Sequence, residues 1–213
     1  MGVLTRIFLL SPANCGGARA KQLTSAKAQF ALAEQLRSRR GAMLGDVFMF
    51  VSGLYFRGKL TYALKFAAPP EPETSSGVHI ITPNAGLRGP ETYITRRAIE
   101  SFAEADVHQD NLKYRRPLER SARTLADEIG PECDVVLLGS IASPKYVDVL
   151  LDIFGGRLRF PIDFVGRGDM SRGGLLLRKA REGAELPYVT IAGAPRHGAR
   201  PPKLPPLPRC PAL

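Results

Sequence analysis

The sequence predicts an α/β protein, a three-layer α/β/α sandwich around a mainly parallel sheet. Short and mostly continuous apolar runs, which are typical of strands buried on both faces, alternate with segments whose apolar residues recur at the helical period. With 213 residues, 44% of them hydrophobic, the chain can bury one substantial core. We therefore expect a single α/β domain over residues 1–194 and a proline-rich, basic, disordered tail over residues 195–213.

The expected elements alternate along the chain. The expected strands are Val3–Leu10, Asp46–Ser52, Val78–Thr82 and Asp134–Gly139, with Arg157–Pro161 and Tyr188–Ile191 as added strands. The expected helices are Ala20–Arg37, Phe56–Ala67, Ile94–Glu104, Pro117–Ile129, Pro144–Phe154 and a short Gly173–Arg181. This alternation favours parallel strands with helical connections.

The charge balance favours anionic partners. Lys and Arg number 30 against 20 Asp and Glu, giving a formal net charge of +10. Such a surface attracts nucleic acid, although a basic pI also fits loose, non-specific attraction. Part of the excess lies in the expected tail, on Arg196, Arg200, Lys203 and Arg209. That tail is either solvated or a polyproline ligand over Pro205–Pro208.

The cysteines indicate a reducing compartment. Cys15, Cys133 and Cys210 lack zinc-ligand spacing, so we expect reduced thiols in a cytoplasmic protein. No apolar run reaches the ~18 residues of a membrane span, and the first segment fits a buried strand better than a signal peptide. We expect no metal and no cofactor, and the oligomeric state stays open.

A polar or Gly-rich motif follows each of the first four expected strands. Ligands bind at the carboxyl ends of parallel strands, so these motifs together predict a pocket. After the fourth strand, Gly139 and Ser140 lead to Ser143, which has N-cap chemistry, and to Lys145. The motif fits a phosphate site at a helix N-terminus, or equally an ordinary turn between a strand and a helix.

The motif after the first strand combines glycines, which let the backbone approach a ligand, with basic residues. Its candidate ligand-binding residues are Ser11, Asn14, Gly16, Gly17 and Arg19. Cys15 is a candidate nucleophile, but no base is expected beside it, so a structural thiol is favoured.

The second and third motifs offer stacking and polar contacts. Beyond Gly53, Tyr55 could stack on a base while Arg57 or Lys59 holds a phosphate. Alternatively, Tyr55 packs in the core and the two cations extend to water. Asn84 could read a polar ligand edge or assist catalysis, or it could belong to an ordinary turn.

A Gly-rich segment over residues 166–174 carries the best candidate carboxylate. We expect a loop that wraps a polar ligand, with Arg167, Ser171 and Arg172 on a phosphate and Asp169 as general base. The alternative is an internal Arg–Asp ion pair in a structural turn.

Two short motifs resemble the peroxide-stress YaaA-like proteins: Ser11-Pro12-Ala13 and Ser52-Gly53-Leu54-Tyr55. The spacing between residues 54–59 and residues 81–87 resembles the spacing in uncharacterised bacterial proteins associated with nucleic-acid modification and defence. The resemblance covers roughly the first 95 residues and rests on motifs of low specificity. It implies DNA binding and a stress or repair setting. The chain departs from the pattern over residues 14–17 and 56–59.

Two functions follow from these patterns. The first is a nucleic-acid- or nucleotide-binding protein of bacterial stress or repair, with a phosphate-binding cleft and N-glycosidic bond chemistry as a further option. The second is a small-molecule enzyme that acts on a nucleotide or sugar phosphate. The expected partner is nucleic acid or a phosphorylated nucleotide.

Overall fold

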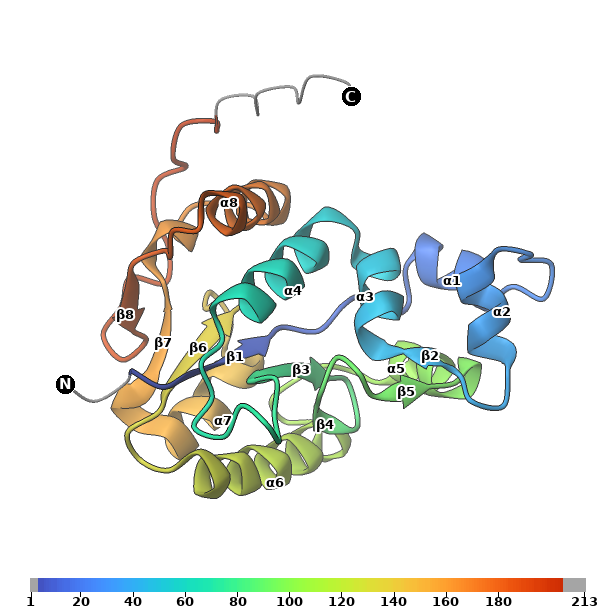
Figure 1. The fold of residues 1–213 in the computed structure, drawn as a ribbon, viewed down its shortest axis with the longest axis horizontal. Helices are drawn as coiled ribbons and strands as arrows, with labels where there is room; N and C mark the ends of the chain where they lie inside the picture. The colour runs from blue at the N-terminus through green and yellow to red at the C-terminus, as the bar shows by residue number, and fades with distance from the viewer. Residues whose placement is uncertain (1–3, 205–213) are drawn as a thin grey trace.

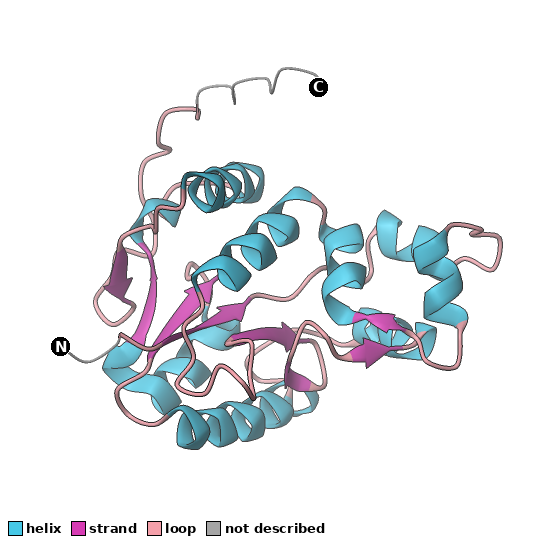
Figure 2. Ribbon diagram, in the orientation of Figure 1, coloured by secondary structure: helices cyan, strands magenta, loops and turns pink. Residues whose placement is uncertain are grey.

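The protein is an α/β protein built on a mixed, mostly parallel sheet (Figures 1 and 2). The computed structural model describes residues 4–204. The sheet order is β4-β3-β1-β6-β7-β8. The strands are β1 Arg6–Leu10, β3 Val78–Thr82, β4 Gly86–Arg88, β6 Asp134–Leu138, β7 Leu158–Pro161 and β8 Tyr188–Thr190. The neighbours from β3 to β7 pair in parallel, while β4 and β8 pair antiparallel at the two edges.

Two pairs of helices flank this sheet. Figure 1 shows α4 (Leu54–Phe66) beside α8 (Asp169–Glu182) on one side, and α6 (Leu112–Ile129) beside α7 (Pro144–Phe154) on the other. The remaining elements are α1 Ala18–Thr24, α2 Ala31–Arg37, β2 Ala42–Met43, α3 Leu44–Ser52, β5 Tyr93–Ile94, α5 Arg96–Glu104 and the 3-10 turns Gly155–Arg157 and Ile162–Phe164. Helices α1, α2, α3 and α5 gather with the β2–β5 pair at one end of the molecule.

The expected strand Asp46–Ser52 is wrong, because this segment belongs to helix α3. Its buried residues Leu44, Val47, Phe48 and Val51 follow helical spacing and form one stripe. A short apolar run does not distinguish a buried strand from a buried helix, and here the helix forms. The second motif therefore lies at a junction between helices, where Gly53 has a φ of 63°.

Three other expected boundaries also need correction. Ala20–Arg37 is divided between α1 and α2, with a turn-rich break between them. Helix α6 begins before Pro117, because the side chain of Asn111 caps it by accepting from the backbone N–H of Lys113 at 3.1 Å. Helix α8 begins at Asp169, so residues 169–174 of the expected ligand loop are helical.

Two glycines bring α4 and α8 into backbone contact. A Cβ built on Gly173 of α8 would lie 2.8 Å from both the carbonyl oxygen of Leu54 and the Cα of Tyr55. A Cβ on Gly58 of α4 would lie 2.6 Å from the carbonyl oxygen of Gly173. Only glycine at both positions permits this crossing, which fixes the N-terminal part of α8 beside the N-terminal part of α4.

The segment after β8 follows the surface of α8 and α7. Leu204 packs against the core, and Arg196 Nη2 lies 3.7 Å from Asp148 Oδ1. Pro205–Pro208, Arg209 and Cys210 lie outside the described residues, and the disorder of the tail stays a prediction. Within residues 4–204, every helix is too short or too polar to cross a membrane.

Candidate functional site

The carboxyl ends of β1 and β6 are neighbours at the centre of the sheet. Leu10 pairs with Leu138, and the backbone N–H of Ser11 donates to Leu138 O at 3.2 Å. The chain leaves β1 toward β3 on one side, and later returns to β6 on the other side of β1. This reversal of strand order is where open α/β sheets bind ligands.

A pocket of about 470 Å³ opens at this point. The sequence-predicted residues that line it are Ser11, Asn14, Tyr55, Ser140, Ser143, Lys145 and Asp169. Pro12, Ala13, Ser52, Val107 and Tyr146 also line it and were not predicted as site residues. Tyr146 follows Lys145 directly in the motif after the fourth expected strand, whereas no pattern marks Val107.

The N-terminus of α7 forms one wall of the pocket. Ser143 has extended backbone angles and makes no side-chain cap hydrogen bond, and Pro144 occupies the first turn. Lys145 is exposed at the pocket wall, and Ser140 Oγ accepts from the N–H of Ala142 at 3.3 Å. A helix N-terminus beside an exposed ammonium group favours an anion.

Ser11 and Tyr146 are packed closely against Gly139. A Cβ at Gly139 would lie 2.8 Å from Tyr146 Oη and 2.9 Å from Ser11 Cβ. Tyr146 Oη donates to Ser140 O at 2.8 Å. Burial raises the pKa of Tyr146 to about 12, so the phenol is neutral near pH 7.

Lys59 of α4 is buried directly behind Ser11. Its Nζ lies 2.6 Å from Ser11 O and 2.8 Å from Ser11 Oγ, and 4.6 Å from the centre of the Tyr55 ring. Burial lowers the pKa of Lys59 to about 7, with a smaller opposing effect from Asp169. With a side chain 1% exposed, Lys59 contacts Ser11 and not a ligand in the pocket.

Helix α8 contributes Asp169 to the pocket. Its carboxylate is exposed and lies 3.7 Å from Arg172 Nη1. The guanidinium of Arg172 donates through Nε and Nη2 to Phe164 O, at 3.2 and 3.1 Å. Arg172 is thus largely occupied by backbone. An Arg–Asp ion pair is present, but it lies within helix α8 and not in the structural turn that the sequence left as an alternative.

Comparisons with protein-family models, curated proteins and solved structures all gave no match. The resemblance to the YaaA-like proteins therefore stays a prediction.

Cys15 has the properties of a structural thiol. It is buried, its Sγ donates to Ala13 O at 3.7 Å, and burial raises its pKa to about 12. A reactive cysteine needs the opposite, an exposed thiol with a lowered pKa. Neighbouring Gly16 donates its N–H to Asn14 Oδ1 at 3.1 Å, and Gly17 is the N-cap of α1.

Several other predicted residues lie away from the pocket. Arg19 donates to Phe50 O at 3.4 Å and lies against Gly53, and Arg57 is exposed on α4. Arg167 donates to Asp163 O at 2.9 Å and to Ser171 Oγ at 3.2 Å. Arg167 and Ser171 line a different groove, beside residues 200–204.

Asn84 lies in a second pocket, between β4 and α6, together with His79 and Arg120. Its amide donates to Ser101 O at 3.1 Å and to Ser101 Oγ at 2.7 Å. These bonds anchor the turn after β3 to α5. The structure therefore separates Asn84 from the Ser11 pocket.

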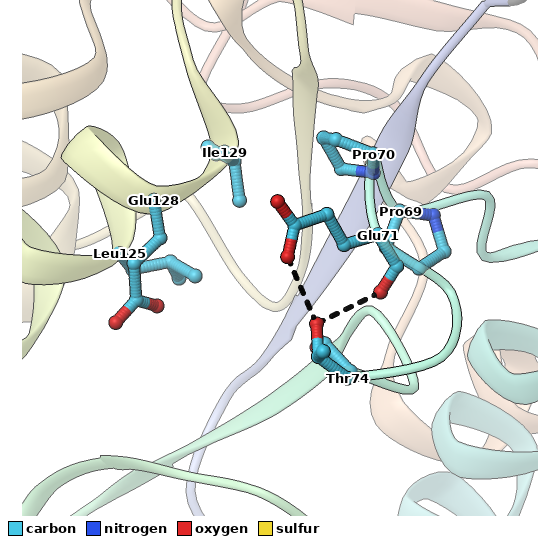
Figure 3. Close-up of a pocket in the computed structure, with 8 residues that line it drawn as sticks. Pro69, Pro70, Glu71, Thr74, Leu125, Glu128 and Ile129 are labelled. Carbon is cyan, nitrogen blue, oxygen red and sulfur yellow. Dashed lines mark hydrogen bonds between the residues drawn. The ribbon is translucent and has the colours of Figure 1, made fainter.

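Figure 3 shows a third pocket, of about 350 Å³, between the loop after α4 and the end of α6. Thr74 donates to the carbonyl oxygen and to Oε2 of Glu71, both at 3.2 Å, and Glu128 lies across the opening. Two carboxylates without a lining cation disfavour a phosphate here. Within residues 4–204, no three His, Cys, Asp or Glu side chains group together as metal ligands.

Proposed function

We propose that the pocket at the ends of β1 and β6 binds a phosphate-bearing nucleotide. The observation that carries this proposal is the meeting of Ser11, Ser140, Lys145 and Asp169 at the point where the strand order reverses. In this proposal the sheet is the middle layer of the three-layer sandwich expected from the sequence. Helices on both faces would then leave the strand ends open to ligand.

Each wall of the pocket suits a different part of such a ligand. The phosphate lies at the N-terminus of α7, against Lys145. The Asp169 carboxylate accepts hydrogen bonds from sugar hydroxyls, and it is the group from which N-glycosidic chemistry would proceed. Val107 and the edge of Tyr55 offer an apolar surface to the base.

A melting screen over nucleotides and sugar phosphates tests this proposal. A ligand at about 100 times its Kd stabilises the fold by about 2.7 kcal/mol, which raises the Tm of a chain of this size by about 5–10 °C. Lys145→Ala should remove most of that rise, and Lys27→Ala, at another exposed lysine, should preserve it. No rise with any phosphate compound, or an equal rise in Lys145→Ala, would contradict the proposal.

Nucleic-acid binding is a second candidate, supported by one face of α6. Lys113, Arg116, Arg120 and Arg123 are all exposed and follow one another at steps of three, four and three residues. This spacing places four cations along one side of a helix, where they can follow a phosphate backbone.

Charge reversal on α6 tests this second candidate. We expect oligonucleotide affinity to fall steeply with salt, and the double variant Arg116→Glu/Arg120→Glu to reduce the slope of log K against log salt by about 2. The control Lys27→Glu/Arg181→Glu makes the same change of charge on exposed residues elsewhere. The α6 surface is excluded if the wild type binds no oligonucleotide at low salt, or if both double variants weaken binding equally.

A further inference from the structure

We propose that Ser11 is a nucleophile, that Lys59 is its general base, and that this pair cleaves carboxylic esters in the pocket. The proposed nucleophile is independent of the nucleotide proposal. Only a substrate ester whose alcohol part places a phosphate beside Lys145 would rest on that proposal.

The geometry of the pair is that of an activated hydroxyl. Lys59 Nζ lies 2.8 Å from Ser11 Oγ, within hydrogen-bond reach for proton transfer. Ser11 itself lines the pocket, while Lys59 is 1% exposed behind it. Ser11 is 7% exposed, so only a small part of it reaches the pocket, and its base is shielded from bulk water.

Burying this amine is costly for a merely structural contact. A lysine without a carboxylate in direct contact loses its hydration, and an apolar side chain of similar length would fill the same volume without that loss. Both hydrogen bonds that the structure gives to Nζ go to oxygens of Ser11. A buried base directed at a single pocket hydroxyl is a feature of functional sites.

The surroundings of Lys59 favour the neutral amine that a base requires. Burial lowers the pKa of Lys59 to about 7; Asp169 of α8 opposes this shift, whereas Arg172 of α8 assists it. Tyr55 faces the amine from its own helix, and Tyr146 approaches Ser11 from α7, both as neutral phenols. In the structure Lys59 Nζ donates to both Ser11 O and Ser11 Oγ. In the proposed step the neutral amine keeps an N–H bond to Ser11 O, and its lone pair takes the proton of Ser11 Oγ.

The proposed reaction needs only the ester and water. Ser11 Oγ attacks the carbonyl carbon while Lys59 takes its proton, and the tetrahedral adduct expels the alcohol, which receives that proton from Lys59. Water then attacks the acyl-serine, giving one proton to Lys59, and the carboxylic acid departs as Ser11 regains the proton. Tyr146 Oη donates to Ser140 O, and this bond holds the phenol beside Ser11 against Gly139.

Labelling with an alkyl fluorophosphonate tests the nucleophile. Wild-type protein should gain one phosphonyl group on Ser11, located by peptide mass spectrometry, and should hydrolyse p-nitrophenyl acetate. Ser11→Ala should lose both properties, while Ser76→Ala, at an exposed serine of the loop after α4, should keep both. Wild-type protein without a label on Ser11 would overturn the proposal, and nucleotide melting would be unaffected by that outcome.

The role of Lys59 has its own measurements. Lys59→Met should slow labelling by about 10²–10⁴-fold, whereas Lys27→Met should not. In wild-type protein the labelling rate should rise with pH and level off above a pKa of about 7. A rate independent of pH between 5 and 9 would exclude Lys59 as the base, even if Lys59→Met fails to fold. Equal labelling in a folded Lys59→Met protein would exclude it as well.

Discussion

Gly173→Ala is expected to destabilise the protein severely, although alanine is the better helix former. The added Cβ would lie 2.8 Å from backbone atoms of Leu54 and Tyr55, and neither can move without shifting α4. Overpacking of this kind costs about 1–3 kcal/mol or more. For a chain of this size the Tm should therefore fall by about 2–12 °C, which calorimetry would measure.

Gly174→Ala is the matched control, one position along the same helix. A Cβ there meets only Leu204 Cδ1 at 3.7 Å, an ordinary van der Waals distance. This variant should gain helix propensity and be neutral or more stable by up to ~1 kcal/mol. If both variants have the same Tm, the close crossing of α4 and α8 is absent in solution.

Lys59→Met should change the pH dependence of stability as well as the chemistry of the site. The lysine has a pKa of about 7 in the folded protein and 10.5 as its ordinary value. Between these values the unfolded chain binds the proton and the folded protein does not, so wild-type stability rises with pH. Below pH 7 the folded protein bears the full free-energy cost of burying the charged amine of Lys59. This cost decreases as the pH rises above 7.

Urea unfolding of both proteins at pH 6.5, 7.5 and 8.5 would measure this effect. The difference in the free energy of unfolding, Lys59→Met minus wild type, should be largest at the lowest pH. It should then decline by at most ~1.4 kcal/mol per pH unit above pH 7. Lys27→Met, at an exposed position, should show no such trend. A constant difference between Lys59→Met and wild type would mean that Lys59 stays protonated in the fold.

The sheet was largely predictable because its strands are buried on both faces. In β1 and β6 the apolar residues are continuous and fully buried, and the sequence shows the same runs. The same reasoning failed over Asp46–Ser52, where a continuous run lies in α3 and only one stripe is buried. The hydrophobic content of this run does not distinguish the period of a strand from the period of a helix.

The site was predictable where it depends on strand ends. Ser11 and Ser140 meet because β1 and β6 are parallel neighbours, and Lys145 follows at the start of the next helix. The burial of Lys59 was not predictable, because it results from the covering of α4 by α8. That contact depends on two glycines more than a hundred residues apart, and no local pattern reports it.

The crossing of α4 and α8 also has a consequence for the order of events during synthesis. Ser11 and Lys59 leave the ribosome early, but Asp169 and the helix that carries it follow about a hundred residues later. Until that helix docks on Gly58, the amine of Lys59 remains hydrated and keeps its ordinary pKa. A nascent chain would therefore hold an inert serine, and the chemistry proposed for it would begin only with the last large helix in place.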